Sequence, residues 1–278
     1  MAKKMKANKK PSTAKADPNQ QLRMIGGVLV LAVVLIIGVI VVGQIAAGDP
    51  VTIDENETYR GVPIGGQHAG AREVELASDV AAGVERGVNE DGIPYFGDPN
   101  AAIQIADFSD FSCPACGQYH DTFVELLRDF GRSGDAVFYY FPLDAASRAP
   151  QSTDASRAAL CAAEQGGFWE MHDEIFRVQL AESLGRFTPE GLEDMADDIG
   201  LDGSEVRACM STNAPDAGMV RTDQVAREYG VSATPTLLYR LRGQESWQTM
   251  PTNDGQISGG RSYDFMANLI RQANDTES

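Results

Sequence analysis

The sequence predicts an α/β domain with a helical insertion, preceded by a single N-terminal transmembrane helix. Three observations support this prediction: an uncharged apolar run near the N-terminus, strands and helices that alternate after residue 100, and a Cys-x-x-Cys pair where one of those helices begins. The chain has 278 residues, four cysteines and a formal net charge of −17. This length allows one sizeable globular domain with appendages.

The charge is divided unevenly along the chain. Residues 1–24 hold six lysines and Arg23 against Asp17, whereas the remaining residues hold 16 arginines, no lysine and 39 acidic residues. The acidic part argues against nucleic acid as a partner, because a phosphate-binding domain needs a basic face. An acidic composition without lysine is typical of proteins from a salt-rich environment, and it can also reflect a bias towards arginine. The sequence does not decide between these two explanations.

Met24–Gly43 is a run of twenty residues without a charge. A helix of that length spans about 30 Å, the hydrocarbon thickness of a bilayer. The run also lacks the polar face of a buried soluble helix. We therefore predict a transmembrane helix over residues 24–47, in contact with membrane lipid, after a basic tail over residues 1–23.

The alternative to a membrane anchor is a cleaved signal peptide, because Ile45-Ala46-Ala47 resembles a small-residue cleavage site. The apolar run exceeds the usual signal core of about 7–15 residues, which favours the anchor. The preceding basic residues place the N-terminus in the cytoplasm by the positive-inside rule. Both interpretations make the rest of the chain extracytoplasmic, where disulfides are permitted, and the anchor makes it a single-pass protein of the cytoplasmic membrane.

Residues 48–94 are rich in Gly, Asp, Glu and Pro, and we predict a tether that holds the next domain away from the lipid. The domain is predicted over residues 95–278. Apolar runs beside turn residues predict strands over 101–108 and 136–143. Between these strands, apolar residues recur at helical spacing after the cysteine pair until Gly131.

A block of helices over about residues 146–229 interrupts the alternation. Helical spacing of apolar residues, with Pro and Gly at the ends, gives the expected elements. They are helices over 155–163, 168–176, 189–199, around Cys209 and over 220–229, then strands over 236–241 and about 247–250, and a final helix after residue 260. This order is typical of a thioredoxin-like fold with a helical insertion.

The motif Cys113-Pro114-Ala115-Cys116 has three conceivable uses. A structural zinc site needs four ligands, which the other cysteines and the three histidines do not supply in any known spacing, so we predict no metal. A structural disulfide across two residues gains little loop entropy. Redox exchange fits better, because free N–H groups and the helix dipole stabilise a thiolate at Cys113, and Cys116 is close enough to resolve a mixed disulfide.

The segment Asp107-Phe-Ser-Asp-Phe-Ser-Cys113-Pro-Ala-Cys116 resembles the active-site segment of the DsbA family of thiol–disulfide oxidoreductases. Three further segments are similar to that family: residues 230–236 to its cis-proline loop, 161–172 to the start of its helical insertion, and 258–260 to its closing segment. Together they span residues 95–272. The membrane anchor departs from the soluble periplasmic members and resembles anchored relatives.

The resemblance implies roles for individual residues. Cys113 would be the exposed nucleophile, Cys116 the buried resolving thiol, and Pro114 the start of the helix. Pro235, expected in cis after Thr234, would lie against the pair and present backbone to an extended substrate.

Further residues take their expected roles from the same resemblance. Asp107 would be a buried acid that helps move the proton of Cys116, although an Asp at a strand end can also face solvent. Cys161 and Cys209 would form a structural disulfide within the insertion. His120 is expected to be exposed without a catalytic role, and Trp169 and His172 are expected to be packing and surface residues.

These features predict an extracytoplasmic oxidoreductase that introduces disulfides into exported proteins and needs no cofactor. Its expected partners are reduced or misfolded exported proteins and a quinone-linked membrane protein, similar to DsbB, that reoxidises it. The Pro-Ala dipeptide lacks the imidazole of the most oxidising members, so an isomerase or a reductase stays open. A redox-inert thioredoxin-fold binding or chaperone module is the alternative from another class.

Overall fold

The structure, a computed structural model, describes residues 83–144, 150–181, 184–250 and 258–276. All of them belong to the second of two compact units, Ile53–Ser278. The predicted basic tail, transmembrane helix and most of the tether lie outside the described residues. Among the residues that are described, no helix is both long and apolar enough to cross a bilayer.

A mixed sheet forms the centre of the described domain, with the strand order β1-β2-β4-β3-β5-β6. Strands β3 (Ile103–Ser109) and β4 (Ala136–Pro142) are parallel neighbours. Strand β5 (Thr236–Leu241) runs antiparallel along the other side of β3 and pairs with the short strand β6 (Gln248–Thr249). β3 and β4 are buried along almost their whole length, because continuous apolar strands are covered on both faces.

Strands β1 (Arg86–Val88) and β2 (Pro94–Phe96) extend the sheet beyond β4. The sequence predicts a tether over residues 48–94 and a domain that begins at residue 95. Because β1 and β2 belong to the sheet, the domain begins before residue 95. Each of these strands has three residues, too few to display the alternation from which a strand is recognised.

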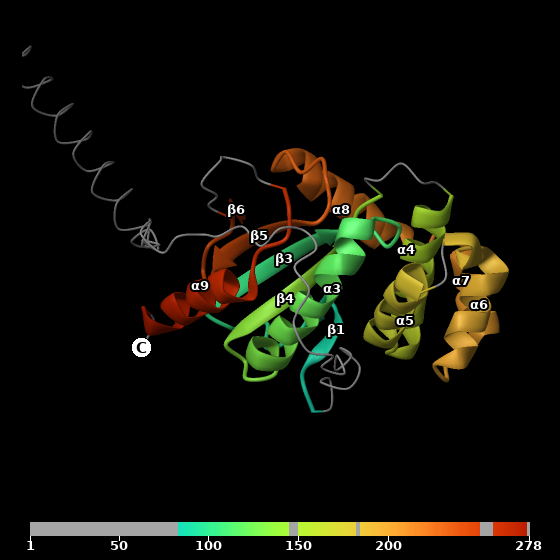
Figure 1. Ribbon diagram of the computed structural model, residues 1–278, viewed down its shortest axis with the longest axis horizontal. Coiled ribbons are helices and arrows are strands. Elements are labelled where there is room, and N and C mark those ends of the chain that lie inside the picture. Colours follow the sequence, from blue (N-terminus) through green and yellow to red (C-terminus); the bar gives the residue numbers. More distant parts are fainter. Residues whose placement is uncertain (1–82, 145–149, 182–183, 251–257, 277–278) are drawn as a thin grey trace, which may run out of the picture. The chain divides into compact units, whose positions relative to one another are not determined.

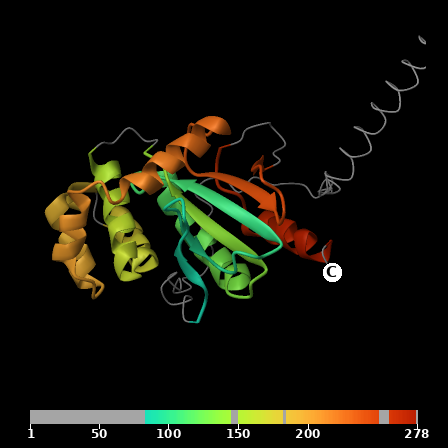
Figure 2. The same ribbon diagram turned by 180° about the vertical axis from the view of Figure 1, so that it is seen from behind.

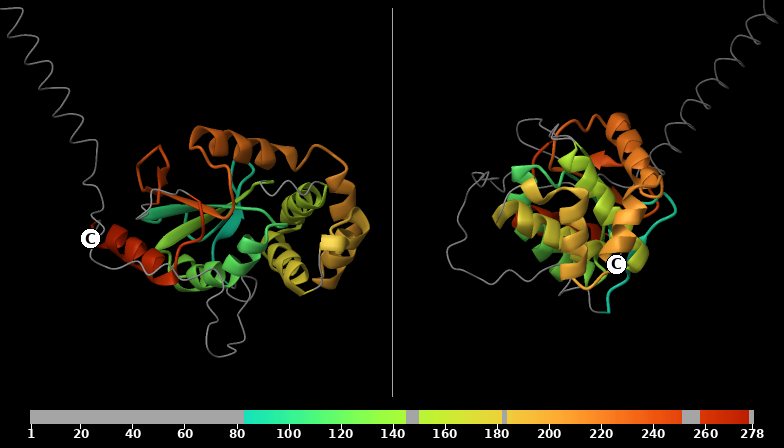
Figure 3. Two further views of the ribbon diagram at one scale, coloured as in Figure 1. Left: turned by 45° about the horizontal axis from the view of Figure 1, so that its top comes forward. Right: turned by 90° about the vertical axis from the view of Figure 1, so that its right-hand side faces the viewer.

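Helices cover both faces of the sheet (Figures 1 and 2). Helices α3 (Pro114–Leu126) and α9 (Tyr263–Asp275) lie on one face, and α8 (Asp216–Glu228) crosses the other, as the left view of Figure 3 shows. Helix α3 continues into a π-helical turn, η1 (Leu127–Gly131), which ends at the predicted glycine. The sequence predicts that α8 belongs to the insertion, but its buried Val225 and the residues around it join the core cluster on the sheet.

The helical insertion lies at one end of the sheet (Figures 1 and 3). It consists of α4 (Gln151–Ala162), η2 (Ala163–Gln165), α5 (Phe168–Ala181), η3 (Leu184–Arg186), α6 (Pro189–Asp198) and α7 (Gly203–Met210). At the predicted start of α6, the Thr188 hydroxyl accepts a hydrogen bond from the N–H of Gly191, and Pro189 occupies the first turn. The predicted order of strands, helical block and closing strands and helix is confirmed.

Candidate active site

Cys113 ends the turn that joins the central strand β3 to α3, and Cys116 lies in the first turn of α3. Cys113 has extended backbone at φ −82° and ψ 120°, and Pro114 is the first residue of the helix. The carbonyl oxygen of Cys113 accepts hydrogen bonds from the N–H groups of Cys116 (3.1 Å) and Gly117 (3.2 Å). Both cysteines are free thiols, and Cys113 is half-buried whereas Cys116 is buried. A large substrate can therefore reach the first sulfur but not the second.

The two thiols differ in acidity. A hydrogen bond from the Cys116 thiol lowers the pKa of Cys113 to about 5; burial opposes this shift, while the Thr234 side chain and the N–H groups of Cys116 and Ala115 add to it. Burial and the neighbouring Cys113 raise the pKa of Cys116 far above its ordinary value. Since the thiolate is the reactive form, the site offers a nucleophile at Cys113 and a protonated thiol at Cys116 near neutral pH.

The loop before β5 lies against Cys113. The Thr234–Pro235 peptide bond is cis, and the Sγ atom of Cys113 lies 3.6 Å from the carbonyl oxygen of Thr234. The segment before α9 supports this loop, because the N–H of Gly259 donates to the carbonyl oxygen of Pro235 at 2.6 Å. Thr236 and Gly259 form an isolated parallel bridge beside it. Thr234 and Pro235 therefore border the reactive sulfur.

Asp107 lies inside the domain, so the solvent-facing alternative is wrong. Its side chain is 2% exposed, its Oδ1 atom has no hydrogen-bond partner among the described residues, and burial raises the pKa of the carboxyl to about 8. Asp107 pairs with Tyr140 of β4 in the register of the sheet. Burial raises the pKa of Tyr140, and the negative charges of Asp107 and Cys116 add to the effect. Asp107, Tyr140 and Cys116 thus belong to one buried polar region.

Asp110 shapes the active-site turn, a role that is not among those predicted from the sequence. Its Oδ1 atom accepts hydrogen bonds from the N–H (2.7 Å) and the hydroxyl (2.8 Å) of Ser112, and its own N–H donates to the Sγ of Cys116 at 3.5 Å. Ser152 of α4 donates to the same Oδ1 at 2.5 Å. The Asp-x-Ser spacing is an Asx-turn signal that could have identified Asp110 from the sequence.

Gln179 of α5 also holds this turn, and it is not among the predicted site residues. Its Nε2 group donates to the carbonyl oxygens of Phe111 (2.7 Å) and Cys113 (2.9 Å). The residues that these two contacts join are separated by 68 and 66 positions in the sequence, so no local sequence pattern predicts the contacts. The helical insertion is therefore hydrogen-bonded to the turn that carries Cys113.

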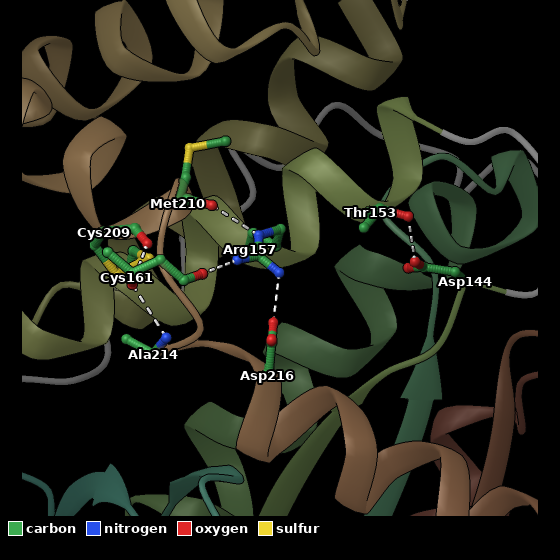
Figure 4. A network of polar contacts seen from close by, with 9 residues as sticks. Asp144, Thr153, Arg157, Cys161, Cys209, Met210, Ala214 and Asp216 are labelled. Carbon is green, nitrogen blue, oxygen red and sulfur yellow. Dashed lines mark hydrogen bonds and ion pairs between the residues drawn. A yellow bond between two sulfur atoms is a disulfide. The ribbon is translucent and has the colours of Figure 1, made fainter.

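A disulfide joins Cys161 of α4 to Cys209 of α7 (Figure 4). Beside it, the guanidinium of Arg157 donates to the carbonyl oxygen of Met210 at 2.9 Å and forms an ion pair with Asp216 at 2.5 Å. The disulfide and Arg157 together connect α4 with α7 and with the start of α8.

His120 is buried, which corrects the expectation that it is exposed. Its Nε2 lies 2.9 Å from Oδ1 of Asp173, and Nδ1 of His172 lies 3.1 Å from the same oxygen. Burial lowers the pKa of His120, but the hydrogen bonds to Asp121 and Asp173 outweigh burial and raise it to about 9. The His120–Asp173 ion pair therefore links α3 to α5.

The ligand atoms of His120, His172 and Asp173 lie within 4.8 Å of one another, a grouping that the sequence analysis missed. The two hydrogen bonds to Asp173 already occupy one nitrogen of each ring. The rings of Trp169 and Phe176 pack edge-on against His172, at 5.4 and 5.0 Å between centroids. We therefore interpret the grouping as a structural link between the two helices.

The described residues thus combine a mixed sheet covered by helices on both faces with a pair of free thiols, Cys113 and Cys116, where α3 begins. The chain belongs to the thioredoxin family: residues 89–246, more than half of its length, match the family model described as thioredoxin.

Solved structures with this fold include BdbD of Bacillus subtilis in its oxidised form. That structure has a TM-score of 0.55 and 19% identity, with 69% of this chain and 98% of that chain covered. The α-DsbA1 protein of Wolbachia pipientis gives a TM-score of 0.55 and 17% identity, with 69% of this chain and 97% of that chain covered. At these identities the similarity concerns the fold.

Curated proteins with similar sequences include the Na(+)/H(+) antiporter NhaA 3 of Salinispora tropica. It is 34% identical over 147 residues, which are 52% of this chain and 21% of the antiporter. Disulfide bond formation protein D of Bacillus subtilis is 24% identical over 106 residues, which are 38% of this chain and 48% of that protein. The chain thus spans only about a fifth of the antiporter and about half of the Bacillus protein.

Proposed function

We propose that this protein introduces disulfides into exported proteins through Cys113 as the nucleophile and Cys116 as the resolving thiol. The observation that carries the proposal is the contrast between the two sulfurs. The half-buried Cys113 has its pKa lowered to about 5, while the buried Cys116 has its pKa raised. Similarity to Disulfide bond formation protein D supports the same activity.

The reaction begins with the disulfide form of the pair. A substrate thiolate attacks the Sγ of Cys113, the Cys113–Cys116 bond breaks, and Cys116 leaves and takes up a proton. A second substrate thiolate then attacks the substrate sulfur of the mixed disulfide and releases the Cys113 thiolate. The substrate loses two electrons to the enzyme, and the low pKa of Cys113 favours this direction because it makes this sulfur a good leaving group.

Asp107 supplies the proton that Cys116 needs in this scheme. Burial keeps its carboxyl protonated up to about pH 8, so a proton is present in the buried region at neutral pH. Thr234 and Pro235 form the surface on which an extended substrate segment lies beside Cys113. Pro114 begins the helix, and the N–H groups of Ala115 and Cys116 in its first turn help to lower the pKa of Cys113.

Continued turnover needs a partner that accepts the two electrons, and we propose a quinone-linked membrane protein for this role. The apolar run within residues 24–47 would place the enzyme in the same membrane, with its catalytic domain outside the cytoplasm. A reporter that is active only outside the cytoplasm, fused after Ser278, should be active. A fusion active only as a cytoplasmic reporter would contradict this placement.

Two experiments test the direction of exchange. In the first, the protein is equilibrated with glutathione buffers, and in the second its oxidised form is added to a reduced, unfolded substrate protein. We expect a reduction potential above about −200 mV and stoichiometric oxidation of the substrate. The Pro-Ala dipeptide favours a weaker oxidant, so a reductase or isomerase is the second candidate. A potential near about −270 mV, as in thioredoxin, would support the reductase and contradict the oxidase.

A further inference from the structure

We propose that Gln179 is a positioning residue for Cys113: its amide holds the backbone of the active-site turn so that the Cys113 sulfur stays against the N–H groups at the start of α3. The proposal rests on the proposed function of Cys113 and adds a residue of the helical insertion to it. Gln179 touches the backbone of the turn and has no contact with the reacting atoms in this scheme.

The hydrogen bonds of Gln179 match the needs of the turn. An amide NH2 group has two hydrogens, and the two carbonyl oxygens of Phe111 and Cys113 lie 2.7 and 2.9 Å from Nε2. The Cys113 oxygen also accepts the first hydrogen bonds of α3, from Cys116 and Gly117. Gln179 therefore fixes the carbonyl group from which the helix begins.

The orientation of the amide is determined by these two acceptors. With the group reversed, Oε1 would face two carbonyl oxygens and no donor, so the hydrogen-bond network selects the orientation with Nε2 towards the turn. In this orientation Oε1 is buried and has no hydrogen-bond partner among the described residues. The two donated hydrogen bonds offset the cost of leaving this oxygen without a partner.

Gly117 provides the space that Gln179 occupies. A Cβ atom added at Gly117 would lie 2.0 Å from Oε1 of Gln179 and 3.1 Å from Cδ2 of Leu180. The amide thus lies directly on the first turn of α3, and any side chain at residue 117 would displace it. This gives a second, independent way to remove the contact.

Loss of the contact should make the Cys113 thiolate less stable. The N–H groups of Ala115 and Cys116 lower the pKa of Cys113, and they do so only while the turn keeps them directed at the sulfur. A turn released from Gln179 would sample orientations in which these hydrogen bonds are lost. The result would be a less acidic Cys113 and a weaker oxidant.

The test compares Gln179→Leu with Gln165→Leu in the full chain. Gln165 is a matched control, because its amide also bonds a backbone carbonyl of the insertion, that of Asp202, at 3.1 Å. The ultraviolet absorbance of the thiolate, titrated in the reduced protein, reports the pKa of Cys113, and glutathione equilibrium reports the potential. We expect the pKa to rise by about one unit in Gln179→Leu, a tenfold loss of thiolate at low pH, and to stay unchanged in Gln165→Leu.

A folded Gln179→Leu protein whose titration overlays that of the wild type would overturn the proposal. If Gln179→Leu fails to fold, Gly117→Ala provides the test, since it displaces the amide and should raise the pKa in the same direction; an unchanged titration there would overturn the proposal equally. The titration requires no substrate. A wild-type protein with an acidic Cys113 but no oxidase activity would therefore contradict the proposed function alone.

Discussion

The Sγ atom of Cys113 lies 3.6 Å from the carbonyl oxygen of Thr234, although 121 positions separate the two residues in the sequence. The contact brings the loop before β5 against the accessible sulfur of the pair. It also brings the Thr234 side chain into hydrogen-bonding range, where it lowers the pKa of Cys113. The acidity of Cys113 is therefore set partly by a residue that lies far from it in the sequence.

Thr234→Val should raise the pKa of Cys113 by about half a unit to one unit, because valine keeps the shape of threonine but cannot donate a hydrogen bond to the thiolate. Thiolate absorbance, titrated in the reduced protein, measures the shift. Thr249→Val, at an exposed position of β6, is the control. Equal titrations of the Thr234 variant and the wild type would mean that the hydroxyl makes no contribution.

The reduced protein should lose stability relative to the oxidised protein as the pH falls. The pKa of Cys113 is lowered in the folded state from 9.0 to about 5, so its ionisation contributes stability that is fully present above about pH 9 and is lost as the pH falls through about 5. Cys113 has no thiol in the oxidised form. Urea unfolding of both forms between about pH 4 and 8.5 measures the difference in their free energies of unfolding. A difference that stays constant over this pH range would contradict the prediction.

Asp107→Asn should stabilise the protein and slow its reaction. Burial raises the pKa of this carboxyl from 3.8 to about 8, so stability falls as the pH rises between these values, because the unfolded chain ionises first. We expect a gain of about 2–4 kcal/mol at pH 7 from urea unfolding. Turnover should slow because the proton for Cys116 is lost, and a variant that is neither more stable nor slower would remove Asp107 from the scheme.

Asp173→Asn should destabilise the domain by about 3–5 kcal/mol, since it removes the buried carboxylate from the His120 ion pair and leaves only the exposed Asp121, 3.6 Å away, beside that charge. The pKa of His120 is raised to about 9, so the stability that the pair contributes is fully present below about pH 6.5 and is lost as the pH rises through about 9. Thermal unfolding at pH 6 and pH 9.5 measures both effects. The exposed Asp194→Asn is the control, and equal melting temperatures in the two variants would refute the link between α3 and α5.

The fold could be predicted where the chain has long segments of one periodicity. The apolar run of β4 and the helical spacing after Cys116 gave strand and helix correctly. Strands β1 and β2 could not be predicted, because three residues are too few to show a periodic pattern. The pairing of β1 with β2 and of β2 with β4 is set by tertiary contacts.

The residues alone predict the candidate site only where its parts are adjacent in the sequence, whereas the place of Thr234 and Pro235 beside Cys113 was expected from the family resemblance. Cys113, Pro114 and Cys116 occupy four consecutive positions, and the physics of a helix start assigns them a chemistry. Gln179 and the His120–Asp173 pair act across contacts that span 53 to 68 positions, which no local pattern encodes. Their roles follow from the packing of α5 against α3.

The most direct test of the central claim, that Cys113 is the nucleophile, uses reduced Cys116→Ala and Cys113→Ala proteins with oxidised glutathione at pH 7. The Cys113 thiolate should attack the glutathione disulfide, release one glutathione and keep the other, because no resolving thiol is left. Peptide mass mapping should find one adduct, on Cys113 of the Cys116→Ala protein, and none on Cys113→Ala. An adduct that forms on Cys116 of the Cys113→Ala protein, with none on Cys113, would contradict the account.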